Sequence, residues 1–242
     1  MTANPSCKLD IVEHAKVTEV IDGDTVRLAD GRQVRLVGTQ APKLSLGRKH
    51  FVDWPLAGES KVALEKLVEG RSVGLAFGGL RIDRNGRTLA HLYLDGGEWL
   101  QGAMILAGMA RVYTWSDNRA CAAELIARER DARAAKRGIW ALPYYRIRNV
   151  NELDDEIDTF QIVEGQIVSA DESRGRAFLN FGRDYKTDFT VTIAPEDMKL
   201  FRAISLNPST LAGKKIRVRG WLALLNGPEI GVTHPEQIEI LP

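Results

Sequence analysis

Short β-branched segments separated by glycine turn signals run through the N-terminal part of this 242-residue chain. Residues 17–28 read VTEVIDGDTVRL, in which the central glycine predicts a tight turn between two strands. The dipeptide Asp30-Gly31 is a strong hairpin signal, and the alternating residues 32–37 after it predict a third strand. These segments together predict a β-meander.

Strand and helix patterns alternate up to about residue 140. Residues 73–77 and 88–94 predict two further strands on either side of an irregular loop. Helical spacing of apolar residues, or a composition rich in alanine, glutamate and arginine, predicts helices at 59–68, 98–107 and 120–137. The first part of the chain is therefore expected to be mainly β with helices, an α+β arrangement.

The composition changes after the third predicted helix. Residues 142–158 are acidic and aperiodic, as is typical of a linker between domains. Residues 159–242 are rich in β-branched segments and contain one short helical pattern, which favours a second small OB-like β-barrel. We expect an N-terminal tail at 1–13, a first domain at 14–141, the linker and this second domain. The strands expected in the second domain are 160–168, 177–181, 188–193, 216–222, 230–232 and 238–241, with the helix at 196–204.

Composition and charge exclude several classes of protein. Apolar residues make up 44% of the chain and charged residues 27%, so the chain can form a sizeable core. No apolar run approaches the ~18 to 20 residues that a membrane span needs, and we expect no association with a membrane. The net charge of +1 indicates no particular partner, although the first 141 residues are mildly basic, which is compatible with nucleic-acid binding.

Four segments of the first domain carry its most specific motifs. They read VIDGDTVRL at 20–28, VRLVGTQAP at 34–42, RIDRNGRTLAHLY at 81–93 and ARAAKRGIW at 132–140. In this order and spacing they resemble the staphylococcal nuclease (thermonuclease) family over about half of the chain. The resemblance implies a five-stranded OB-type barrel carrying three helices, which agrees with the pattern of strands and helices above.

The resemblance also implies a reaction, the hydrolysis of phosphodiesters in DNA or RNA, usually with calcium. In the family, carboxylates hold the metal, a glutamate activates water, and two arginines bind the phosphate, because attack on an anionic phosphodiester needs its charge neutralised. By position, Asp24 falls on a metal-binding carboxylate, and Arg35 and Arg87 fall on the two arginines. Tyr113 and Trp115 fall where the family places aromatic side chains near the nucleotide base.

Two positions depart from the family pattern. Gln40 stands where the family usually has a second metal-binding aspartate, and Lys43 stands where it has the catalytic glutamate. Gln40 still offers calcium an uncharged oxygen, whereas protonated Lys43 has no acceptor and cannot take a proton from water. We therefore expect calcium binding to be weak or absent. Hydrolysis should be slow and either independent of metal or dependent on an unusual group.

Several roles stay open for the residues around these positions. Lys43 fits a solvated surface lysine, a phosphate ligand, or a base with a depressed pKa. A substitute base could come from the loop at 44–55, which contains His50 and Asp53. Asp22, in the same turn as Asp24, is expected to order the loop.

Two functions follow from these residues. The first is a nuclease-family protein that binds nucleic acid and hydrolyses it weakly, with Arg35 and Arg87 as the phosphate clamp. The second is a catalytically inactive domain that acts as a nucleic-acid-binding or protein-interaction scaffold. The sequence does not distinguish DNA from RNA, and we expect a monomer.

The chain contains two cysteines, Cys7 and Cys121, far apart and without the short spacing of a zinc site. They are either two free thiols or one disulfide, and we expect the disulfide. A disulfide requires an oxidising compartment, and the family is usually exported, so we expect a periplasmic or secreted protein. Residues 1–10 contain no apolar signal segment, which leaves the alternatives of a cytoplasmic protein or of a signal removed before residue 1.

Overall fold

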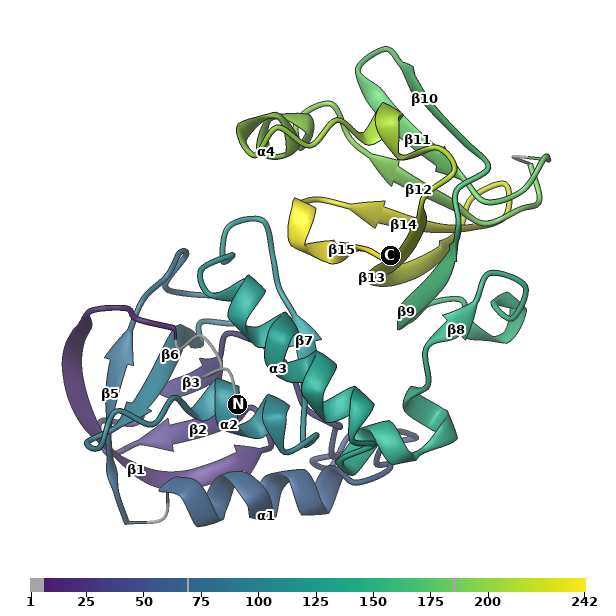
Figure 1. Cartoon of the computed structure of the whole chain (residues 1–242). Coiled ribbons are helices and arrows are strands. Elements are labelled where there is room, and N and C mark those ends of the chain that lie inside the picture. Colours follow the sequence, from purple (N-terminus) through teal and green to yellow (C-terminus); the bar gives the residue numbers. More distant parts are fainter. Residues whose placement is uncertain (1–6, 69, 185) are drawn as a thin grey trace. The chain divides into compact units, whose positions relative to one another are not determined.

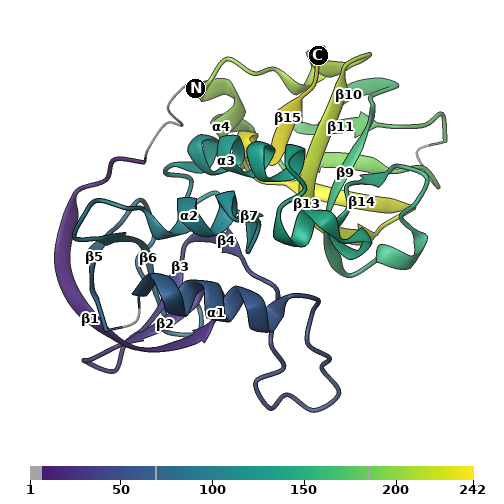
Figure 2. The same ribbon diagram turned by 60° about the horizontal axis from the view of Figure 1, so that its bottom comes forward.

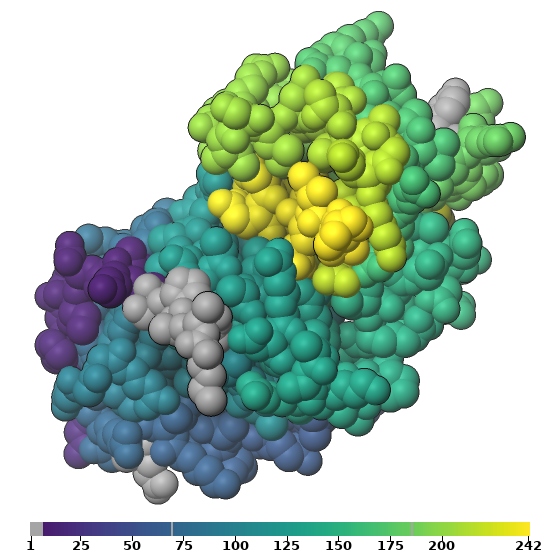
Figure 3. Space-filling view, in the orientation of Figure 1, coloured from purple at the N-terminus to yellow at the C-terminus, as the bar shows by residue number. Residues whose placement is uncertain are grey.

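The computed structural model describes residues 7–68, 70–184 and 186–242. The chain divides into two compact units, Met1–Tyr145 and Arg146–Pro242. In Figures 1 and 3 the first unit runs from purple to teal and the second from green to yellow. Residues 1–6 of the expected N-terminal tail lie outside the described residues, and the finer domain limits expected from the sequence stay predictions.

The first unit contains a closed five-stranded barrel in the order β1-β2-β3-β6-β5. The first half of β1 pairs with β5 and its second half with β2, so one long strand closes the barrel. β-branched and leucine side chains such as Val26, Val34 and Leu36 point inwards and are fully buried. The expected mainly β fold with an OB-type barrel is confirmed. The barrel strands are β1 (Ile11–Asp22), β2 (Thr25–Leu28), β3 (Gln33–Leu36), β5 (Ser72–Ala76) and β6 (Thr88–Leu94).

The described part of the same unit contains three α-helices: α1 (Ala57–Val68), α2 (Leu100–Leu106) and α3 (Ala122–Ala134). Each lies within a few residues of the helix that the sequence predicts. The end of α2 is fixed to the segment after α3 by a close backbone contact, in which the Ile139 N–H donates to the carbonyl of Gly108, at 2.8 Å. Figure 2 shows the three helices beside the barrel and the loop between β4 and α1 extending away from it.

A short antiparallel ribbon, which the sequence did not predict, joins two parts of this unit. It consists of β4 (Gly38–Gln40) and β7 (Arg111–Tyr113), with Gly38 opposite Tyr113 and Gln40 opposite Arg111. Strands of three residues are too short to show an alternating pattern.

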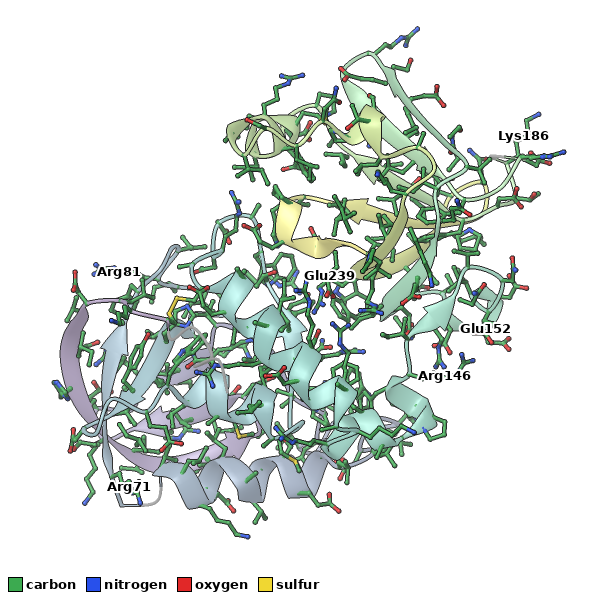
Figure 4. The ribbon with its side chains drawn as sticks, viewed as in Figure 1. Arg71, Arg81, Arg146, Glu152, Lys186 and Glu239 are labelled. Atoms are coloured by element: carbon green, nitrogen blue, oxygen red, sulfur yellow. A yellow bond between two sulfur atoms is a disulfide. The ribbon has the colours of Figure 1, made fainter. Side chains whose placement is uncertain are left out.

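Cys7 and Cys121 form a disulfide that ties the N-terminal segment to the start of α3, with a Cα–Cα distance of 5.3 Å. It is drawn as a yellow bond in Figure 4. Cys7 is buried, and the hydroxyl of Tyr93 donates to its carbonyl at 3.1 Å. The disulfide therefore belongs to the core of the first unit.

The second unit is an eight-stranded sheet in the order β10-β11-β12-β14-β13-β9-β8, with β15 on β13. These strands form a half-barrel sheet, which agrees with the second small OB-like β unit that the sequence favoured. Its elements are β8 (Arg148–Asn149), β9 (Thr159–Gln166), β10 (Ser169–Ser173), β11 (Arg176–Asn180), β12 (Thr190–Ile193), α4 (Met198–Ala203), β13 (Lys215–Leu224), β14 (Pro228–Val232) and β15 (Ile238–Ile240).

The acidic segment expected as a linker is structured for much of its length. Its strand β8 pairs in parallel with β9, and Leu153 is buried in the second core. Arg146 and Glu152, labelled in Figure 4, form an ion pair at 2.6 Å. Glu156 likewise pairs with Arg148, so two of the acidic residues are partners of nearby arginines. The 3-10 helices among the described residues are Gly138–Ala141, Pro143–Tyr145, Asp154–Glu156, Pro208–Leu211 and Pro235–Gln237.

Among the described residues, no helix combines the length and the apolar character that crossing a membrane requires.

Candidate functional site

Four charged side chains meet at the turn between β1 and β2 and form what we call the Asp24 cluster: Asp22, Asp24, Arg35 and Lys43. The Nζ of Lys43 lies 2.8 and 2.7 Å from the two carboxylate oxygens of Asp24 and 3.3 Å from Oδ2 of Asp22. Arg35, on β3, donates from Nη1 to Oδ1 of Asp24 and from Nη2 to the carbonyl of Thr39 at 2.9 Å. The cluster thus contains two carboxylates and two cations.

The Asp-Gly-Asp turn positions Asp24 through its backbone. The Asp24 N–H donates to Oδ1 of Asp22 at 3.0 Å, and the Asp24 carbonyl accepts the N–H of Leu36 at 2.8 Å. The Ala41 N–H donates to Oδ2 of Asp24 at 2.7 Å. The glycine between the two aspartates is needed because a Cβ at Gly23 would overlap Oγ of Ser60 on α1.

Burial and neighbouring charge set the protonation of the cluster. Burial opposes ionisation of Asp24, yet the charges of Arg35 and Lys43 hold its pKa far below the ordinary range. Burial, together with the nearby charge of Asp24, raises the pKa of Asp22. Burial opposes the charge of Arg35, but Asp24 and Asp22 outweigh it and raise the pKa of Arg35. Asp24 is therefore ionised and Arg35 cationic at neutral pH.

Arg87 lies on the same outer face of the barrel as Arg35 but outside the Asp24 cluster. In the parallel β3–β6 pair, Arg35 is opposite Leu89, and Arg87 lies two residues before Leu89, so both arginines project to the same side. The Arg87 side chain is held by Asp83, with Nε and Nη2 at 2.8 and 2.7 Å from Oδ2. Among the described residues, no hydrogen bond or ion pair joins Arg87 to Asp24.

The two aromatic residues expected to stack on a base lie at the end of the β4–β7 ribbon. Tyr113 is opposite Gly38, and its ring meets that of Trp115 edge-on, with centroids 5.2 Å apart. About half of Trp115 is exposed. Their role in binding a base stays a prediction.

The residues present do not fit a calcium site. Calcium takes six to eight oxygen ligands, mostly carboxylates and carbonyls. Both oxygens of Asp24 already accept hydrogen bonds from cationic or backbone donors, and the Oε1 of Gln40 accepts from Nε of Arg111 at 2.8 Å. No group of three or more histidine, cysteine, aspartate or glutamate side chains suited to a metal occurs in the described part of the chain.

The structure does not bring the candidate substitute bases into the cluster. Asp53 accepts the backbone N–H of Ser45 at 2.5 Å within its own loop, and His50 is exposed. Among the described residues, no hydrogen bond or ion pair connects either side chain to Asp24 or Lys43.

Two residues that matter to the site were missed from the sequence. Asp83 holds Arg87, and the signal for it was present, because an aspartate before Asn85-Gly86 is typical of a turn that hydrogen-bonds its own backbone. Arg111 covers the oxygen of Gln40, and no local pattern marks it, because its partner lies 71 residues earlier.

An aromatic series in the loop after Lys43 was also missed. The ring of Trp54 lies 6.5 Å from that of Phe51 and 6.2 Å from that of Tyr144, between centroids. Arg48 lies 3.7 Å above the ring of Phe51. The Trp54 N–H donates to the carbonyl of Lys43 at 2.9 Å, so the series begins beside the Asp24 cluster.

Comparisons with known proteins agree with this barrel. Residues 33–142 match the family model described as staphylococcal nuclease homologue. A protein of Escherichia coli O157:H7 named as an uncharacterized endonuclease is 30% identical over 131 residues, which are 53% of this chain and 77% of that protein. A probable staphylococcal-like nuclease of Oryza sativa subsp. japonica is 34% identical over 114 residues, which are 47% of this chain and 27% of that protein.

The chain therefore belongs to the staphylococcal nuclease family, which is a family of nucleic-acid hydrolases.

Proposed function

We propose that the first unit binds phosphodiester groups of nucleic acid on the outer face of the barrel that carries Arg35, Lys43 and Arg87. We further propose that hydrolysis there is weak and needs no calcium. The observation that carries the proposal is the position of Lys43, whose ammonium contacts both oxygens of Asp24 where the family pattern has a carboxylate base.

Phosphate binding is supported by the donors that remain on Arg35. A guanidinium has five N–H donors, and the contacts of Arg35 with Asp24 and Thr39 use two of them. The remaining donors suit a bidentate contact with phosphate oxygens. Arg87 and the ammonium of Lys43 would add charge to the same contact.

Slow hydrolysis is supported by the lack of a suitable base in the Asp24 cluster. Asp24 is held ionised and fully hydrogen-bonded, so it is a poor proton acceptor. A positioned general base contributes roughly 10²- to 10⁴-fold to such a reaction, and a protonated lysine at position 43 does not provide it.

Binding is tested with fluorescently labelled single-stranded DNA and RNA at several salt concentrations. We expect Arg35→Ala/Arg87→Ala to weaken binding at least tenfold and to lower the slope of log K against log salt by roughly 1.4, because two phosphate contacts are lost. The matched control is Lys61→Ala/Arg71→Ala, which removes a half-buried charge on α1 and an exposed charge just after it. Equal loss in both double variants would reject the clamp.

Cleavage is tested with the same substrates in calcium, in magnesium, in manganese and in EDTA. We expect slow cleavage at the same rate in all four conditions and its loss in the Arg35→Ala/Arg87→Ala variant. Strong cleavage that strictly requires calcium and disappears in Lys43→Ala would contradict the proposal.

A second candidate is a catalytically inactive scaffold, and the charge balance of the site favours it. The two carboxylates of the cluster neutralise its two cations, and Asp83 pairs with Arg87. A site with little net charge attracts a polyanion weakly. If no polynucleotide binds even at about 50 mM salt, the scaffold becomes the better description.

A further inference from the structure

We propose that Lys43 is a built-in counter-ion that takes the place of a divalent cation between Asp22 and Asp24, and that removing its ammonium opens a site for such a cation. This inference rests on the proposed function only in that it concerns the same site. It describes the protein without nucleic acid, so it does not depend on phosphate binding.

The contacts of Lys43 are those of an enclosed cation. An ammonium has three N–H donors, and Nζ lies 2.7, 2.8 and 3.3 Å from three carboxylate oxygens. These oxygens belong to two side chains, Asp22 and Asp24, whose exposed fractions are 9% and 0%. The Lys43 side chain itself is 19% exposed, so its charge is screened little by water.

Removal of the ammonium leaves the cluster with an excess of negative charge. Arg35 still donates to Oδ1 of Asp24, but it makes no hydrogen bond to Asp22 among the described residues. Two carboxylates would then face one guanidinium across the space that Nζ had filled. Hard divalent cations bind such sites through one or two carboxylates completed by water.

Two variants remove the positive charge of Lys43. Lys43→Ala removes both the ammonium and the side chain, and Lys43→Glu also supplies a third carboxylate. Lys43→Arg is the matched control, because it keeps a cation at the same place and should keep divalent ions out.

The test measures divalent-ion binding to the full chain without nucleic acid. Free Mn²⁺ is titrated by electron paramagnetic resonance, and the melting temperature is recorded with and without CaCl₂. We expect Lys43→Ala and Lys43→Glu to bind one Mn²⁺ per chain at least tenfold more tightly than the wild type, and to melt higher in calcium. The wild type and Lys43→Arg should show neither effect.

Two results would overturn the inference. One is a wild-type protein that binds one Mn²⁺ per chain and loses it on Asp24→Asn, a measurement that depends on no Lys43 variant folding. The other is a Lys43→Ala variant that is folded by circular dichroism but binds Mn²⁺ no better than the wild type. Neither result bears on phosphate binding by Arg35 and Arg87, so the two proposals fail separately.

Discussion

Among the residues of the site, Asp24 makes the central contacts, because its carboxylate binds both Arg35 and Lys43. A buried ion loses several kcal/mol of hydration, and only close partners of opposite charge offset that loss. Arg35 and Lys43 provide those partners from β3 and from the segment after β4. The Asp24 cluster is therefore a structural connection between three segments as well as a candidate site.

Asp24→Asn is predicted to destabilise the first unit. It removes the charge that Arg35 and Lys43 share, and leaving buried cations without their partner costs about 3 to 5 kcal/mol. Urea unfolding at pH 7 measures the loss. The control is Asp95→Asn, whose side chain is 78% exposed and should change stability by less than about 0.5 kcal/mol. Equal losses in the two variants would show that the cluster does not hold the unit together.

For single residues, the sequence predicted which residues lie at the site better than it predicted the contacts between their side chains. The motifs named Asp24, Arg35 and Arg87, because residue types at fixed spacing are visible in a sequence. The role of Lys43 as a counter-ion was not among its expected roles, because its contact with Asp24 depends on how β4 leaves the barrel. The hydrogen bond of Gln40 with Arg111 was hidden for the same reason.

At the scale of elements, β6 is joined to the start of α2 by a buried neutral histidine. Nδ1 of His91 accepts the indole N–H of Trp99 at 3.2 Å, and burial lowers the pKa of His91 from 6.5 to about 4. Since the folded state favours the neutral ring, this contribution to stability is complete above pH 6.5. It declines as the pH falls from 6.5 towards 4.

The free energy of unfolding is therefore predicted to fall by up to about 3 kcal/mol between pH 6.5 and pH 4 through His91 alone. Urea unfolding at several pH values measures this decline. His91→Asn keeps an acceptor but does not titrate, so its stability should depend less on pH over this range. If the stability of His91→Asn depends on pH as strongly as that of the wild type, titratable groups other than His91 cause the decline.

The end of α2 depends on two glycines that approach each other. Gly108 has φ of +70°, and a Cβ there would overlap the carbonyl of Arg137, just before Gly138. Gly108→Ala should therefore destabilise by more than about 2 kcal/mol. Gly58→Ala is the control, because Gly58 lies in α1 and no atom would lie within 4 Å of the added Cβ, so this variant should gain about 0.5 to 1 kcal/mol of stability. Thermal unfolding of both variants gives the comparison, and a shift in the same direction would contradict it.

The sequence predicted the helices and strands that are long enough to show a repeating pattern of apolar residues, and it missed those that show no such pattern. The strand at 88–94 and the helix in 120–137 each carry enough residues to show their spacing. The strand β10 was missed because its sequence, SADES, is polar and mostly exposed. The first half of β1 was missed because its side chains are largely exposed and show no clear alternation of polar and apolar residues, although its backbone completes the barrel.

At the scale of the whole molecule, the disulfide crosslinks two segments of the first unit and adds no covalent crosslink to the second. Cys7 and Cys121 are 114 residues apart and both lie in the first unit. Closing a loop of that length in the unfolded chain is worth about 4 to 5 kcal/mol in the entropic model.

Reduction is predicted to lower the melting temperature of the first unit by roughly 10 °C and to leave the second unchanged. Scanning calorimetry with and without a phosphine reductant measures both transitions. Cys7→Ser/Cys121→Ser should reproduce the shift without reductant. A single transition that moves as a whole would show that the two units do not unfold independently.

From the Cys7–Cys121 disulfide we also propose that the protein works in an oxidising compartment, because disulfides persist there and are rare in the reducing cytosol. Alkylation of free thiols in freshly lysed cells of the source organism tests this. Thiols that react fully before any oxidant is added would place the chain in the cytosol.

The disulfide also makes the segment from Cys7 to Cys121 a covalent ring, and the loop between β4 and α1 is part of that ring (Figure 2). Val52, in this loop, is 82% exposed and accessible to a protease. A single cut there opens the ring without dividing the chain into separate molecules. The nicked protein should keep its full mass on a non-reducing gel and separate into two fragments only after reduction.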